Sequence, residues 1–221
     1  MRQTAGILIL AALLALAGCS KSDADKNDLS EPRKAALVFA GALESGDIEK
    51  AKYACLAGGI EVELVEAMVT TTYDLRRLSE VATAKFGEAG AEVVARRGPI
   101  DATTYLTNAE VQITGNTARI IARGGINRIP LKLVDGKNWK VDIGAMSVGQ
   151  DIAVGIRTIR AIDGAAKSVI DEIESGKLTT AEDTRVALDE AIASRLGRSR
   201  TPSKGSTSRP ATQQSTTPGV G

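Results

Sequence analysis

The sequence predicts an α+β fold, in which N-terminal helices pack on a cone-like, four-stranded antiparallel meander and a C-terminal helical hairpin follows. Three observations predict it. Apolar residues recur with helical spacing over residues 32–96, alternate singly with polar residues over residues 109–143, and return to helical spacing over residues 150–196. With 221 residues, 43% of them hydrophobic, the chain is long enough for one compact domain with a helical addition.

Residues 1–18 have the three parts of a signal peptide in the required order. Arg2 supplies positive charge, Ile7 to Leu16 form an apolar run, and Ala17-Gly18 are small residues at a cleavage position. A stable membrane-spanning helix needs about twenty apolar residues. The run of ten residues from Ile7 to Leu16 is therefore too short for a permanent anchor.

The four residues Leu16-Ala17-Gly18-Cys19 resemble the lipobox of bacterial lipoproteins, which signal peptidase II cleaves. The resemblance implies that Cys19 carries a diacylglyceryl group and that its freed amino group receives a further acyl chain such as palmitate. Two or three acyl chains give stable membrane attachment, whereas one does not. Ser20, in place of an aspartate, implies the outer membrane, facing the periplasm. An ordinary secretory signal that happens to contain a cysteine stays open as the alternative.

Residues 19–31 are mostly polar or charged and are expected to form a flexible tether between the lipid and the domain. The domain itself is expected over residues 32–149. Its first helix should have Ser30 as N-cap and Pro32 in its first turn, and end before Gly46. Asp47 should then cap a second helix, which runs to about Leu56.

A longer helix is expected over residues 60–86, followed after Gly87 by a short piece that ends before Gly98-Pro99. Four alternating runs come next, separated by glycine-containing turns such as Gly115-Asn116 and Asp135-Gly136. Such short, tightly connected strands predict an antiparallel sheet with one buried face. The runs cover residues 109–113, 118–122, 129–133 and 139–143.

Residues 150–196 predict two paired helices that meet near Gly176. Thr179 and Glu182 have the spacing of a capping box at the start of the second one. Residues 197–221 are rich in serine, threonine and proline, carry only basic charges, and are expected to be disordered.

Over residues 31–144 the element order is similar to that of the nuclear transport factor 2-like and cystatin-like folds. Two stretches carry the resemblance, Gly46 to Ala51 and Gly136 to Asp142, and they look like those of small exported members of unknown function. The resemblance implies a pocket between sheet and helices. Three placements of the helices of residues 150–196 stay open, namely across the sheet, in the mouth of the cone, or as an independent hairpin.

Asp101 and Tyr105 are the candidate residues for that pocket, as a proton acceptor and as a polariser of a carbonyl, with Asp142 as a third candidate residue. Structural roles compete with both aspartate assignments. Asp101 follows a helix-to-strand turn, where a capping aspartate is common, and Asp142 lies one residue out of phase with the expected buried residues Val141 and Ile143. The chain contains no histidine, which removes the commonest general base and a common metal ligand. We therefore expect no catalytic residues, no metal site and no cofactor.

Charge argues against nucleic acid as a partner. The formal net charge is +1, and four basic residues without an acid lie in residues 197–221, so the domain itself is mildly acidic. Cys55 is expected to be a buried, unpaired thiol. The expected function is that of a membrane-anchored envelope lipoprotein whose domain binds a protein partner or a small ligand without catalysis. An enzyme or sequestering pocket of the nuclear transport factor 2-like type is the alternative.

Overall fold

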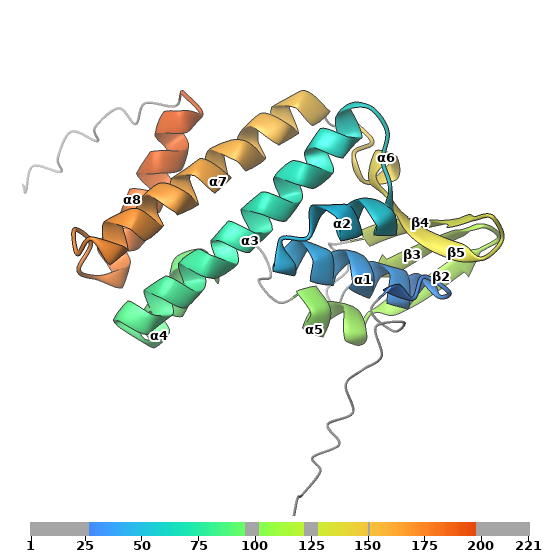
Figure 1. Cartoon of the computed structure of the whole chain (residues 1–221), viewed down its shortest axis with the longest axis horizontal. Coiled ribbons are helices and arrows are strands. Elements are labelled where there is room, and N and C mark those ends of the chain that lie inside the picture. Colours follow the sequence, from blue (N-terminus) through green and yellow to red (C-terminus); the bar gives the residue numbers. More distant parts are fainter. Residues whose placement is uncertain (1–26, 96–101, 122–127, 150, 198–221) are drawn as a thin grey trace, which may run out of the picture.

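The computed structural model describes residues 27–95, 102–121, 128–149 and 151–197 (Figure 1). Helix α1 (Pro32–Ser45) begins with proline in its first turn and ends at Gly46, whose positive φ of 75° forms the C-cap. Its N-cap is Glu31 and not Ser30 as expected, because the Glu31 carbonyl accepts the first intrahelical hydrogen bond, from the Ala35 N–H at 3.0 Å.

Helix α2 (Ile48–Ala54) is capped by Asp47 as predicted, since the carboxylate accepts from the Lys50 N–H at 2.9 Å. The helix ends at Ala54, and the chain then extends as strand β1 (Cys55–Leu56). Helix α3 (Ile60–Phe86) and helix α4 (Glu88–Ala95) fold back on each other at Gly87, where φ is 66°. The short helix α5 (Ala102–Thr107) leads into the sheet.

The α+β class is confirmed, but the expected four-stranded antiparallel sheet is wrong. Among the described residues the sheet has five strands in the order β1-β5-β4-β3-β2, and β1 pairs parallel with β5. The other four strands pair antiparallel with their neighbours in sequence. Strand β1 was not expected because two residues are too short to show alternation. The four longer strands are β2 (Glu110–Thr114), β3 (Thr117–Ile121), β4 (Arg128–Val134) and β5 (Asn138–Asp142).

The chain leaves the sheet through α6 (Ile143–Met146) and continues as α7 (Ile152–Glu174) and α8 (Ala181–Arg195). At the start of each of these helices a side chain accepts a hydrogen bond from a backbone N–H. The accepting residues are Asp142 for α6, Asp151 for α7 and Thr180 for α8. The cap of α8 is thus one residue beyond the predicted Thr179. None of the helices in the described ranges combines the length and hydropathy that a membrane-spanning helix needs.

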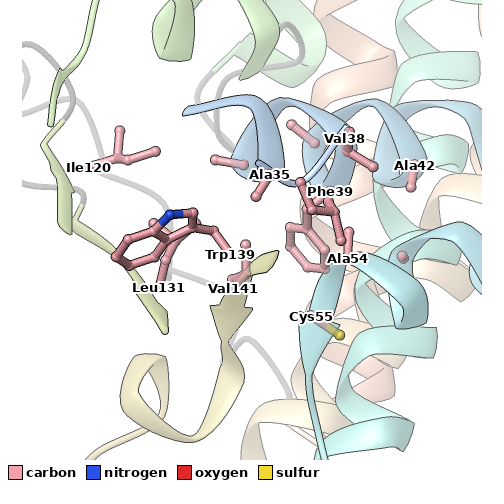
Figure 2. Packing of buried hydrophobic residues seen from close by; sticks show 14 of the residues in the cluster. Ala35, Val38, Phe39, Ala42, Ala54, Cys55, Ile120, Leu131, Trp139 and Val141 are labelled. Atoms are coloured by element: carbon pink, nitrogen blue, oxygen red, sulfur yellow. The ribbon is translucent and has the colours of Figure 1, made fainter. Parts of the chain in front are cut away.

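A first hydrophobic core lies between α1 and the inner face of the sheet. Figure 2 shows Phe39 of α1 beside Trp139 and Val141 of β5, and all three side chains are buried. Leu29 joins this core with 3% exposure, and its carbonyl accepts from the Trp139 N–H at 2.8 Å. The chain therefore packs on the domain already at Leu29, within the stretch that was expected to be tether.

A second core lies among α3, α4, α7 and α8. It contains Leu78 and Ala82 of α3, Ile170 of α7 and Leu188 of α8, all at most 2% exposed. Ion pairs join Glu63 to Arg160 and Arg77 to Glu174, so α3 and α7 run parallel (Figure 1). The C-terminal helices thus take none of the three placements considered, because they pack on α3 and α4.

Candidate functional site

The residues expected to carry function are only partly covered by the structure. Cys19 and Asp101 lie outside the described residues. Tyr105 lies on α5 with 52% of its surface exposed. Asp142 accepts from the Ala145 N–H at 2.9 Å, so its carboxylate serves as the cap of α6.

The inner face of the sheet is filled by side chains where it meets α1. Ile120, Leu131 and Trp139 project from three strands towards α1, with exposures of 0%, 2% and 7% (Figure 2). Ala35 and Phe39 meet them from the helix. The resemblance implied a pocket between sheet and helices, and the part of the sheet covered by α1 leaves no room for it.

An open groove lies between the first turns of α3 and the N-terminal half of α7. Its volume is about 280 Å³. Ile156, which is only 5% exposed, contributes apolar surface to it, and Ile60 adds a side chain that is 45% exposed. The complete lining consists of Ile60, Glu63, Ala153, Ile156, Arg157 and Arg160.

The two arginines of the groove differ in their partners. Arg160 pairs with Glu63 across the two helices at 3.3 Å, and both side chains are more than half exposed. Arg157 has no hydrogen-bond or ion-pair partner within the described ranges. A guanidinium with five donors next to apolar surface can bind a carboxylate or a backbone carbonyl of a partner.

Exposed apolar side chains surround this end of the molecule. Helix α6 lies against the start of α3, because a Cβ on Gly144 would lie 2.9 Å from Glu61 Oε1. Val148 follows α6 with 80% exposure, and Val154 in the first turn of α7 is 48% exposed. Large apolar side chains exposed together are typical of contact surfaces.

Two carboxylates and a lysine form a polar cluster between α3 and α7. Lys167 Nζ lies 3.3 Å from Asp74 Oδ2 and 2.9 Å from Asp163 Oδ2. Burial raises the pKa of Asp74, contact with Asp163 raises it further, and Lys167 opposes the change. Asp163 Oδ1 is also buried, and it has no hydrogen-bond partner among the described residues. Burial and the neighbouring carboxylate thus favour the protonated form of Asp74.

Neither the cluster nor the cysteine offers an evident reactive group. No set of three or more metal-binding side chains occurs within the ranges that the structure describes. Burial raises the pKa of the Cys55 thiol to about 11, and the thiol is 4% exposed. Because the thiolate is the nucleophile, Cys55 is suited to a packing role, as its sequence setting predicted.

Comparison of the chain with protein families, with curated proteins and with solved structures found no match. The lipoprotein and nuclear transport factor 2-like resemblances therefore stay predictions. Sequence reasoning missed the groove. Its lining comes from residues 60–63 and 153–160, far apart in sequence, and only the parallel packing of α3 and α7 brings them together.

Proposed function

We propose that this chain is a lipid-anchored protein of the bacterial cell envelope whose domain binds a partner, a protein or a small ligand, in the α3–α7 groove without catalysis. The observation that carries the binding proposal is the contrast between two surfaces. The sheet face under α1 is packed with side chains, whereas the groove is open and combines apolar surface with Arg157, which has no partner within the described ranges.

The anchoring part of the proposal is supported by Leu16-Ala17-Gly18-Cys19 and the apolar run before it. A tether that ends at Leu29 leaves nine residues between Cys19 and the packed domain. A stretch of nine residues spans at most about 30 Å even when fully extended, so lipid on Cys19 would hold the domain close to the membrane surface.

The alternative, an enzyme or sequestering pocket between sheet and helices, has less support. It needs Tyr105 in a dry cavity, and this side chain is half exposed. It also needs open space near the sheet, and the described part of the inner face under α1 is occupied by Ile120, Leu131 and Trp139.

Anchoring is tested by membrane fractionation and by the mass of the mature N-terminus, in wild type and in Cys19→Ala. We expect the wild type in the membrane fraction with acyl mass on Cys19, and the variant to be unprocessed and without that mass. A wild-type protein that is soluble and carries no acyl mass would contradict the anchoring proposal.

Binding in the groove is tested by placing a photoreactive amino acid at position 153 in cells. Ala84 provides the matched control, because it is also an exposed alanine on a helix but lies at the opposite end of α3. We expect a discrete adduct from position 153 that Arg157→Glu weakens, and none from position 84. Equal adducts at both positions, or none at position 153, would refute a groove-specific partner.

A further inference from the structure

Strand β2 (Glu110–Thr114) is one of the two outer strands of the described sheet, opposite β1, and it pairs with β3 on one side only. The two strands are joined by the two-residue turn Gly115-Asn116, so that Thr114 pairs with Thr117. In such a hairpin the pair next to the turn exchanges backbone hydrogen bonds, and the bonded pairs then alternate along the ladder. Glu110, Gln112 and Thr114 therefore direct their backbone groups towards β3. Val111 and Ile113 direct theirs towards the free edge.

The side chains of this edge are apolar on one face. Val111 and Ile113 lie opposite Ile120 and Ala118 of β3, which are core residues. Ile113 is nevertheless 58% exposed. Edge strands are commonly protected by proline, by charged side chains, above all lysine, or by a bulge. Residues 110–114 contain neither proline nor lysine, pair with β3 without a bulge, and carry a single charge, on Glu110 at the first position of the strand.

We propose that the β2 edge is a self-association site, at which a second copy of this chain pairs antiparallel through its own β2. Antiparallel pairing centred on Gln112 is the only register that pairs all five residues of both strands. It places Val111 opposite Ile113 of the second copy. The two residues can exchange backbone hydrogen bonds, because the N–H and C=O groups of both point towards the free edge. The same relation repeats on the other side of the two-fold axis, which is the form of an isologous dimer.

The charges of the edge fit this register. Glu110 lies opposite Thr114 of the second copy, so no like charges meet. The two Glu110 side chains are four residues apart along the pair, which corresponds to about 14 Å and exceeds the screening length at physiological salt. Val–Ile contacts across the interface cover part of the apolar surface that Ile113 exposes.

The register makes a specific prediction for disulfide crosslinking. Gln112 faces Gln112 of the second copy as a non-hydrogen-bonded pair, whose Cα atoms lie about 4.5 Å apart, within the range that a disulfide spans. Two variants of the full chain, Gln112→Cys and Glu110→Cys, are purified in detergent and oxidised with glutathione disulfide. Wild type controls for Cys19 and Cys55. Glu110→Cys is the matched control, because it lies on the same exposed strand but about 14 Å from its own copy.

We expect at least about ten-fold more reducible dimer from Gln112→Cys than from Glu110→Cys, because only position 112 satisfies disulfide geometry. Adding Ile113→Lys to Gln112→Cys should reduce the dimer to the control level while the circular dichroism spectrum stays unchanged, since Ile113 is largely exposed. Equal crosslinking at the two positions, or a monomer in both, would overturn the proposal. The outcome does not depend on lipid attachment or on the groove.

Discussion

Gly90 is the position where the smallest substitution should have the largest effect. A Cβ at this residue would overlap the carbonyl oxygen of Ala82 and lie 2.7 Å from the backbone nitrogen of Thr83. Both are backbone atoms of α3, so no side-chain rotation can relieve the overlap. Gly90→Ala must push α4 away from α3, although alanine is favoured over glycine in a helix by about 1 kcal/mol.

The cost follows from what α4 buries. Overpacking typically destabilises by about 1–3 kcal/mol, and partial loss of Val93 and Val94 from the second core adds a similar amount. After subtraction of the helix-propensity gain, we expect the free energy of unfolding to fall by about 1–5 kcal/mol. Urea unfolding should be followed by circular dichroism, which reports the helices, and by the fluorescence of Trp139, which reports the first core.

Gly155→Ala is the matched control, because Gly155 lies inside α7 and a Cβ at this residue would meet no atom within 4 Å. Alanine there should raise stability by up to about 1 kcal/mol. If Gly90→Ala unfolds at the same urea concentration as wild type with the same slope, the close contact between α3 and α4 is wrong. If Gly155→Ala is equally damaging, the effect is not steric.

Three further results are expected. The folded-state pKa of Asp74 is raised above 3.8, so protonated Asp74 stabilises the fold at low pH, and this contribution is lost as the pH rises through the raised pKa. Asp74→Asn should therefore reduce the fall in the urea midpoint that wild type shows as the pH is raised from 3.8. Cys55 should resist iodoacetamide in the folded protein and react in urea, as mass spectrometry would show, and rapid labelling of the folded protein would contradict its burial. Asp47→Ala should lower the free energy of unfolding by about 1 kcal/mol through loss of the cap on Lys50 N–H, whereas an unchanged urea midpoint would argue against that cap.

Local signals in the sequence were sufficient to predict most of the helices and strands. Gly46 and Gly87 end helices because they adopt positive φ there, and Asp47 starts one because its carboxylate accepts a backbone N–H. The alternating runs of the four longer strands were also visible, to within one or two residues at each end. Strand β1 was not, because Cys55–Leu56 is extended only through its pairing with β5. Its existence depends on tertiary structure.

The candidate site was hidden for a related reason. The apolar stripe of α7 predicts that one face is buried, but it does not identify the surface that covers it. Val169 and Ile173 pack in the second core with Leu78 of α3, whereas Ile156 contributes apolar surface to the groove, so the stripe is divided between the core and the candidate site. The exposed residues at the groove, Arg157 among them, belong to the remainder of the helix surface and carry no periodic signal.

The groove depends on the same contact that forms the second core. Its walls are α3 and α7, and the Glu63–Arg160 pair that joins them is exposed and therefore contributes little to holding them together. The helices are held further along by buried groups, where Thr71 donates to the Ile159 carbonyl at 3.2 Å and Asp74 meets Lys167. A change in the protonation of Asp74 acts on this contact about three turns of α3 from Glu63. The spacing of the groove walls is thus linked physically to the interior of the helical layer, through packing that both helices share.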